Sequence, residues 1–427
     1  MKLPAQLREE FWTQDAANGG WIRSQYDEIK TVLENRDLAW SKAQYRRIRE
    51  HAIAHTAFYR DYEADDIFPV LNKLEILEHY EDHKADSGFL TPLHISSTSG
   101  STGTPFSVIQ DYKKRMRNIA DLQVFGELCD YPPRERMVFF RVLSEKLHRT
   151  PEQEDRENIY YVDSSNLSSE QLEKMTQVLL EKQPRIVFSY ASTLVELGKY
   201  IDRRDIDPKA FGLRSALTAG EGIAEGDRRM LERVFGCPLY RRYSDMELGI
   251  MGQDKGNGGE YILNYGSYYF ECLKIDRDEP ADSGEVGRIV VTDLFNYAFP
   301  MIRYDTGDLG VMEYFDDGRL PVLKEIYGRS RDCVYATNGD LVSPAKISVS
   351  MWGAAGVSQW QFLQEDRNRY ILKINGNRSC DYGPILDKMR QILGIDAQVS
   401  LEFVDEFPVV ASNKRRAIIC NYDPNTK

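Results

Sequence analysis

The sequence predicts an α/β fold: a large multi-subdomain α/β N-terminal domain and a small α+β C-terminal domain, joined by a hinge. The chain of 427 residues exceeds what one hydrophobic core usually serves. Residues 136–236 alternate between apolar strand-like runs and amphipathic helical runs, which is typical of a sheet covered by helices. After residue 240 the pattern changes to short strands and turns. We therefore expect a large domain over residues 1–327 and a small one over residues 328–427.

Periodicity and capping residues predict the individual elements. Residues 21–62 carry helical periodicity, residues 90–95 form a short extended segment, and residues 111–128 predict a long helix. Ser168 and Ser192 are suitable N-caps for two later helices. The rest of the large domain comprises predicted strands at 136–142, 185–190, 261–263, 268–275, 287–292 and 301–304, helices at 169–181 and 193–203, and a strand–loop–helix unit at 213–236. The small domain comprises predicted helices at 344–352 and 384–393 and strands at 360–362, 370–374, 399–404 and 417–420.

Composition and charge limit the possible partners. Lys and Arg total 55 against 67 Asp and Glu, and this net charge of -12 disfavours nucleic acid or an anionic membrane surface. The six cysteines show no C-x-x-C spacing, so neither a zinc site nor a disulfide framework is indicated. No stretch has the apolar length of a bilayer span, and the N-terminus lacks a signal-peptide core. We expect a cytoplasmic protein, either a monomer or a homodimer.

Residues 96–105, S-S-T-S-G-S-T-G-T-P, form a run of small, hydroxylated and glycine residues. Glycines let backbone N–H groups converge on an anion, and hydroxyls add side-chain donors, so the run suits a phosphate cradle. A flexible serine-rich linker is the alternative that composition alone leaves open. The run does not fit the G-x-x-x-x-G-K-[ST] loop of mononucleotide-binding proteins, because no lysine follows its second glycine.

Three further motif-like stretches follow this run along the chain. They are Tyr243-Ser244-Asp245-Met246-Glu247, Tyr304-Asp305-Thr306-Gly307-Asp308 and Gly328-Arg329-Ser330-Arg331-Asp332. Together with the loop, and with Pro408 and Lys414 near the end, they resemble the motifs of the AMP-forming ligase superfamily. The likeness is greatest to its phenylacetate-coenzyme A ligase branch, which includes members associated with capsule biosynthesis. Segments 55–60, 68–73, 219–221 and 287–292 also resemble that branch.

The resemblance implies a role for each matching residue. It assigns the ATP phosphates to Ser97, Thr98, Ser99, Gly100, Ser101, Thr102, Gly103 and Thr104, and the nucleotide's surroundings to Ala219, Gly220, Glu221, Arg242, Tyr243, Ser244, Asp308 and Arg329. Asp308 would accept hydrogen bonds from the ribose hydroxyls, and Glu247 would bind Mg²⁺, which prefers carboxylates plus phosphate oxygens and water. Lys414 would neutralise charge at the α-phosphate, and Arg331 would lie at the interdomain hinge.

Each of these residues also has an ordinary structural alternative. Taken singly, Asp308 would be a turn residue, Glu247 a helix-start carboxylate, and Lys414 a solvated member of a basic run. The chain departs from the family pattern at Met246, Arg331 and Asn413, and its loop lacks the lysine that many members carry.

The implied activity is adenylation of a carboxylic acid by ATP, with Mg²⁺, followed by transfer to a thiol, usually that of coenzyme A. Transfer to an amine, a hydroxyl or a carrier protein is one alternative, and a catalytically silent nucleotide-binding homologue is another. Phe140, Arg141 and Tyr190 are candidates for the acid pocket, which would favour an aromatic or apolar acid. Large aromatics mostly pack in cores, however, and Arg141, Arg241 and Arg242 could equally pair with an acidic group or lie in solvent.

Overall fold

The computed structural model describes residues 2–36, 38–97, 106–143, 149–317, 319–329, 334–339, 341–342, 347, 350–351, 354–405, 407 and 418–422. Contacts divide the chain into two compact units. The first comprises residues 1–272, 289–306 and 312–325, and the second comprises residues 273–288, 307–311 and 326–427. The mixed α/β class that the sequence predicts is confirmed.

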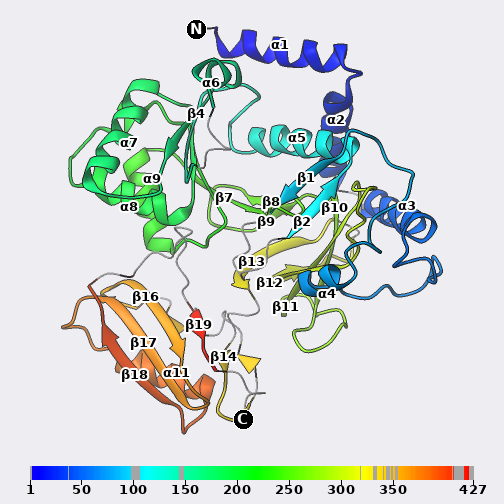
Figure 1. The fold of residues 1–427 in the computed structure, drawn as a ribbon. Helices are drawn as coiled ribbons and strands as arrows, with labels where there is room; N and C mark the ends of the chain where they lie inside the picture. Colours follow the sequence, from blue (N-terminus) through cyan, green and yellow to red (C-terminus); the bar gives the residue numbers. More distant parts are fainter. Residues whose placement is uncertain are drawn as a thin grey trace. The chain divides into compact units, whose positions relative to one another are not determined.

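A sheet of eleven strands organises most of the chain (Figure 1). Its strand order is β10-β11-β12-β13-β9-β8-β7-β6-β5-β3-β4. These strands are β3 (Met137–Arg141), β4 (Ile159–Asp163), β5 (Ile186–Ser189), β6 (Ser215–Ala219), β7 (Leu239–Ser244), β8 (Ile250–Asp254), β9 (Tyr261–Leu263), β10 (Tyr268–Leu273), β11 (Val286–Asp293), β12 (Tyr304–Glu313) and β13 (Val322–Arg329). Neighbours from β4 through β7 pair in parallel, whereas β7 with β8, β8 with β9 and β9 with β13 pair antiparallel.

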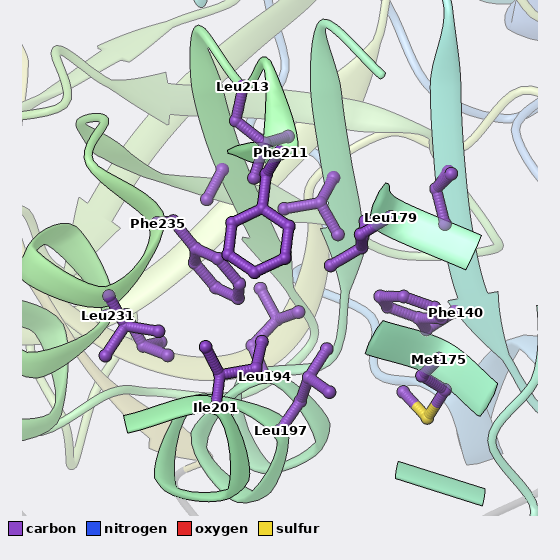
Figure 2. Packing of buried hydrophobic residues seen from close by; sticks show 14 of the residues in the cluster. Phe140, Met175, Leu179, Leu194, Leu197, Ile201, Phe211, Leu213, Leu231 and Phe235 are labelled. Carbon is purple, nitrogen blue, oxygen red and sulfur yellow. The ribbon is translucent and has the colours of Figure 1, made fainter. Parts of the chain in front are cut away.

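Three helices cover one face of the parallel strands: α7 (Ser169–Lys182), α8 (Ala191–Asp202) and α9 (Glu225–Phe235). Figure 2 shows their apolar side chains converging with those of the strands and of the short 3₁₀ helix η2 (Pro208–Phe211). Phe140, Met175, Leu179, Leu194 and Phe211 are fully buried there. Complete burial of such a side chain contributes about 1.5–3 kcal/mol to the free energy of unfolding, so this cluster holds α7–α9 on that face of the sheet.

The remaining helices of the first unit are α1 (Pro4–Ala17), α2 (Trp21–Asn35), α3 (Leu38–His55), α4 (Lys73–Glu78), α5 (Tyr112–Glu127) and α6 (Pro151–Glu157). The stretch predicted as continuously helical from residue 21 is interrupted, because Arg36 adopts a left-handed φ of 52° that ends α2. Helix α5 matches its prediction, and Asp111 caps it by accepting a hydrogen bond from Lys114 N at 2.7 Å. Strand β4 and helices α1 and α6 had no predicted counterpart.

The second unit contains a four-stranded sheet of order β18-β17-β16-β19. Its strands are β16 (Val357–Gln364), β17 (Arg369–Gly376), β18 (Gln398–Phe403) and β19 (Ile418–Cys420), with helix α11 (Gly383–Leu393) and the short pair β14 (Val334–Tyr335) and β15 (Leu341–Val342). Phe362, Tyr370, Leu372 and Met389 lie fully buried in its own hydrophobic core. The predicted α+β character of this part is confirmed. The predicted helix at 344–352 falls largely outside the described residues.

Candidate active site

Four predicted site residues lie at the carboxyl ends of adjacent parallel strands. Arg141 ends β3, Tyr190 follows β5, Ala219 ends β6 and Ser244 ends β7. Because β3, β5, β6 and β7 pair in parallel in that order, these ends meet at one edge of the sheet. Ligands of open α/β sheets bind outside the carboxyl ends of the strands. The topology thus brings together residues that the sequence spreads over a hundred positions.

Two paired strands flank the sequence of the predicted phosphate loop. Strand β1 (His94–Ser97) pairs antiparallel with β2 (Ser107–Gln110), and Ser97 faces Ser107 with their hydroxyl oxygens 2.8 Å apart. The side chain of Asn296 donates to the Ile109 carbonyl at 2.9 Å, which anchors β2. Thr98, Ser99, Gly100, Ser101, Thr102, Gly103 and Thr104 themselves lie outside the described residues. The described part of the site therefore begins at the base of this loop.

The turn after β7 carries Glu247. The Asp245 carboxylate accepts hydrogen bonds from Leu248 N at 2.7 Å and from Gly249 N at 3.4 Å, which closes the turn. Met246 is 59% exposed and Glu247 is half-buried. The Ser96 hydroxyl donates to the Met246 carbonyl at 2.7 Å, so the base of the predicted phosphate loop contacts the turn directly. No hydrogen bond or ion pair engages the Glu247 carboxylate within the described part of the chain.

Two other predicted motifs meet through a hydrogen bond between side chains. The hydroxyl of Tyr243, which is buried in β7, lies 3.3 Å from Oγ1 of Thr306. Thr306 in turn donates to the Ile289 carbonyl at 2.8 Å. Asp308 follows two residues later in β12 and is half-buried. Gly307 between them has a φ of 74°, a conformation that side-chain-bearing residues rarely adopt.

The segment after β6 reaches the start of α8. Gly220 has a φ of 77°, and the Glu221 carboxylate accepts hydrogen bonds from Ser192 N at 2.8 Å and from the Ser192 hydroxyl at 3.1 Å. A carboxylate at a helix N-terminus is favoured by the helix dipole. Tyr190 is the N-cap residue of this helix. Glu221, predicted to lie near the adenine, is therefore bound to the start of the helix whose N-cap is Tyr190, predicted to line the acid pocket.

Both arginines that precede Tyr243 are bound inside the protein. The Arg242 guanidinium donates to the Gln253 amide oxygen from Nε at 3.0 Å and from Nη2 at 2.8 Å, and burial lowers its pKa. Arg241 pairs with the buried Asp254 carboxylate at 2.7 Å. These contacts hold the Arg242 guanidinium inside the protein, on the strand face opposite Tyr243. The nucleotide contact expected of Arg242 from its motif stays a prediction.

Phe140 and Arg141 point to opposite faces of β3. Phe140 is fully buried among the side chains of α7 and α8 (Figure 2), which corrects the expectation that it lines an acid pocket. The Arg141 guanidinium lies 5.0 Å from the ring of Phe139, and Phe139 stacks on Phe188 with ring centres 4.4 Å apart. The buried Nε of Arg141 has no hydrogen-bond partner among the described residues. Arg141 and Tyr190 remain candidates for the acid pocket.

Sequence reasoning missed a buried polar layer beneath the Glu247 turn. It comprises Lys114, Arg117 and Asp121 of α5 together with Tyr268 and Asp293, all of them fully buried. Burial raises the pKa of the Asp121 carboxyl and lowers that of the Arg117 guanidinium. A signal was present in the sequence, because positions 114, 117 and 121 follow the spacing of one helical face that also contains Ala120 and Val124.

Several predicted residues cannot be located in the described structure. Lys414 and Arg331 lie outside the described residues, and only the backbone of Arg329 is described, at the end of β13. Within the described chain, no cluster of three or more His, Cys, Asp or Glu side chains is arranged to hold a metal ion. Nor does any helix in that part combine the length and apolarity that crossing a bilayer requires.

Comparison with known proteins identifies relatives of this chain. The family described as the CapK C-terminal domain matches residues 334–421. Protein CapK from Staphylococcus aureus is 24% identical over 277 residues, which cover 62% of this chain and 59% of CapK. Phenylacetate-coenzyme A ligase from Pseudomonas putida is 25% identical over 256 residues, which cover 55% of this chain and 57% of the ligase. The chain is thus similar to CapK and to the phenylacetate-coenzyme A ligases.

Solved structures share the fold of this chain. 2-Hydroxyisobutyryl-CoA ligase in its postadenylation state, in complex with R3-HIB-AMP, has a TM-score of 0.69 at 16% identity and covers 90% of this chain and 88% of its own. ATP-bound MatB from Rhodopseudomonas palustris has a TM-score of 0.53 at 14% identity, over 76% of this chain and 65% of its own. At these identities the likeness shows a shared fold. The resemblance predicted from the motifs is confirmed, although the matched region spans less than two thirds of CapK and of the Pseudomonas ligase.

Proposed function

We propose that this chain activates an organic carboxylic acid with ATP, forming an acyl-adenylate and pyrophosphate, and then transfers the acyl group to a thiol, most simply that of coenzyme A. One arrangement carries the proposal. The strand ends that bear Arg141, Tyr190, Ala219 and Ser244 share one edge of a parallel sheet. That edge is where α/β folds bind nucleotides and other ligands. The similarity to phenylacetate-coenzyme A ligases supports the same reaction class.

The nucleotide would be bound by the motif residues. Ser97 and residues 98–104 would donate hydrogen bonds to the β- and γ-phosphates. Ala219, Gly220, Glu221, Tyr243 and Ser244 would surround the adenine, Asp308 would accept from the ribose hydroxyls, and Arg329 would lie near the ribose and phosphate. The contact between Ser96 and Met246 supports this grouping, because it joins the base of the phosphate loop to the turn that bears Glu247.

Glu247 has the chemistry that Mg²⁺ requires. Its carboxylate is half-buried and engages no hydrogen bond or ion pair with any described residue. Mg²⁺ is usually bound by one or two carboxylates together with substrate phosphates and water, so a carboxylate that no described residue engages, on the turn that Ser96 contacts, fits it. When bound, the ion would supply positive charge to the phosphate oxygens of ATP.

The chemistry would proceed in two balanced steps. A carboxylate oxygen of the acid attacks the α-phosphorus, the bond to the α–β bridging oxygen breaks, and pyrophosphate leaves. Lys414 would stabilise the negative charge that develops at the α-phosphate. The thiol sulfur then attacks the acyl carbon, AMP leaves with the bonding electrons, and the thiol proton passes to solvent. A rotation of the C-terminal domain about Arg331 would exchange Lys414 for the thiol between these steps.

We assign the acid to the strand ends beside Tyr190 and Arg141. The stacked rings of Phe139 and Phe188 adjoin Arg141 and favour an aromatic or apolar substrate. Aromatic side chains of this kind offer large flat apolar surfaces, and a second ring that displaces water from them is bound more favourably. A carboxylic acid with an apolar body is therefore the substrate class that we propose.

Exchange of labelled pyrophosphate into ATP tests the first step directly. With a panel of aromatic and aliphatic acids, at least one acid should support exchange by the wild-type protein. Lys414→Ala should abolish this exchange, whereas Lys388→Ala, which removes an exposed lysine of α11, should leave it unchanged. ATP binding without exchange for any acid would instead indicate a silent nucleotide-binding protein.

The acceptor requires a product assay on the acid that supports exchange. Coenzyme A should yield a thioester, while hydroxamate formation with hydroxylamine should report the adenylate itself. Turnover with amines or with a carrier protein, but not with coenzyme A, would replace the thiol-ligase assignment by one of the alternative acceptors.

A further inference from the structure

The backbone on both sides of Glu247 is held by side chains from distant parts of the chain. The Met246 carbonyl accepts a hydrogen bond from the Ser96 hydroxyl at 2.7 Å. On the other side, the Leu248 carbonyl accepts from the Tyr268 hydroxyl at 2.6 Å. Within the turn, Asp245 binds the amide of Leu248 at 2.7 Å. Glu247 thus has a fixed backbone and a carboxylate that is not engaged by the described residues.

The Tyr268 hydroxyl belongs to a polar chain in the interior. Lys114 Nζ donates to it at 3.0 Å and pairs with Asp293 Oδ2 at 2.7 Å, and all three residues have no exposed surface. An ammonium group can only donate, and a tyrosine has a single O–H proton. Since Lys114 donates to the Tyr268 oxygen, the Tyr268 proton goes to the Leu248 carbonyl. The two hydrogen bonds therefore donate in one direction, from Lys114 to Tyr268 and from Tyr268 to the turn.

Burying these polar groups costs desolvation free energy. A buried ion pair repays its desolvation only when its geometry and further hydrogen bonds are good, and apolar residues of similar size often stabilise a core as well or better. Gly249 is a second feature that is unfavourable for folding. It has a φ of 119°, and a Cβ atom there would lie 2.9 Å from the Tyr268 hydroxyl. Both features serve the approach of this hydroxyl to the backbone of the turn.

We infer that Tyr268, oriented by Lys114, is a positioning residue that fixes the Glu247 carboxylate for Mg²⁺·ATP. The inference rests on the proposed function, which assigns Mg²⁺ to Glu247. Mg²⁺ demands near-ideal octahedral geometry, so a ligand on a loosened turn would bind it less well. Binding sites work when neighbouring hydrogen bonds restrict their side chains in advance. Tyr268 lies 20 positions from Leu248 and supplies such a restriction from the core.

The test compares two variants that each remove one buried tyrosine hydroxyl. Tyr268→Phe removes the donor to the Leu248 carbonyl. The control Tyr265→Phe removes a hydroxyl that has no hydrogen-bond partner among the described residues. ATP binding by the full-length protein is measured by calorimetry over a series of Mg²⁺ concentrations. For Tyr268→Phe, we expect the Mg²⁺ concentration at half-maximal effect to rise several-fold, while ATP binding without Mg²⁺ stays unchanged. Tyr265→Phe should match the wild type.

Glu247→Gln separates positioning from a loss of stability. If Tyr268 acts through Glu247, adding Tyr268→Phe to Glu247→Gln should not change the dependence on Mg²⁺ any further. Tyr268→Phe with a wild-type Mg²⁺ requirement would overturn the inference, even if its melting temperature falls. If the wild type binds no ATP, or Glu247→Gln leaves its Mg²⁺ dependence intact, the proposed function or its metal assignment fails first, and the inference falls with it.

Hydrogen exchange on the wild type provides a test that does not require the variant to fold. The Leu248 and Gly249 amides, which donate to Asp245, should be protected before any ligand is added. Exchange at the rate of an open loop, with protection only after Mg²⁺·ATP is added, would show that the ligand and not the core orders the turn.

Discussion

The hydroxyl of Tyr243 donates a hydrogen bond to Oγ1 of Thr306 across 3.3 Å, and the Thr306 hydroxyl donates one to the Ile289 carbonyl at 2.8 Å. This bond joins two sequence motifs through residues that lie 63 positions apart and both belong to the first unit. Because both motifs are assigned to the nucleotide, a change at this contact should affect its binding as well as the stability of the fold.

Tyr243→Phe removes this hydrogen bond while keeping the ring. A buried hydrogen bond between neutral groups contributes about 1 kcal/mol, so the free energy of unfolding should fall by that amount. Urea denaturation measures the loss, and calorimetry should show weaker ATP binding. Tyr240→Phe is the matched control, because Tyr240 lies on the same strand and its hydroxyl makes no hydrogen bond with the described residues. Equal effects of the two variants would contradict the role assigned to Tyr243.

Asp308→Ala should weaken ATP binding by roughly 10-fold to 100-fold, because a hydrogen bond to a charged group contributes about 1.5–3 kcal/mol. Comparison with 2′-deoxy-ATP sharpens the test. The wild type should prefer ATP, and Asp308→Ala should bind both nucleotides alike. The control Asp316→Ala changes an exposed carboxylate beyond β12 and should retain the preference. If Asp308→Ala still discriminates against the deoxynucleotide, Asp308 does not bind the ribose.

Gly249→Ala should be among the more destabilising single changes in the first unit. Its Cβ would meet the Tyr268 hydroxyl at 2.9 Å and Asn118 Oδ1 at 3.1 Å, at a φ of 119°. Strain of this kind costs about 1–3 kcal/mol, to which the close contacts add. Gly20→Ala provides a milder reference, because Gly20 has an ordinary left-handed φ of 67° and an added Cβ would meet nothing within 4 Å. The two losses, measured by urea denaturation, should therefore differ clearly, with Gly249→Ala the larger.

His83 should make the protein less stable in mild acid. Burial, with a smaller contribution from the nearby His79, lowers the pKa of His83 from 6.5 to about 4. The His83 ring stacks on Phe58 with centres 4.1 Å apart. Between pH 6.5 and 4 the unfolded chain binds a proton that the folded chain does not, so stability is present above this window and is lost as the pH falls through it.

The matching measurement compares unfolding free energies at pH 7 and pH 5. His83→Phe should remove about 2 kcal/mol of the wild-type difference, given about 1.4 kcal/mol per pKa unit. His79→Gln changes an exposed histidine that contributes only the smaller part of the His83 pKa shift, so this variant should keep most of the pH dependence. If His83→Phe follows the wild-type profile, His83 is not the group responsible.

Much of the architecture could be predicted from local patterns. The strands that became β3 and β5 and the helices that became α5, α7 and α8 were predicted to within two residues of their ends or so, because apolar periodicity and capping residues act over short distances. Strands β16, β17 and β18 and helix α11 of the second unit were predicted for the same reason, and the motif order predicted the similarity to the ligases. The break between α2 and α3 was missed, since a left-handed arginine carries no clear sequence signal.

The sequence by itself determined the α/β class, the resemblance to AMP-forming ligases and the residue types of the candidate site. Only the tertiary structure decided which of those residues are buried against other parts of the protein. Arg242 and Phe140 sit in strands that could present either face, and burial against Gln253 and against α7 and α8 settled their orientation. Likewise, Lys114, Tyr268 and Leu248 meet over long sequence separations. A buried polar group must find its partner wherever the fold brings one, and no local pattern encodes that.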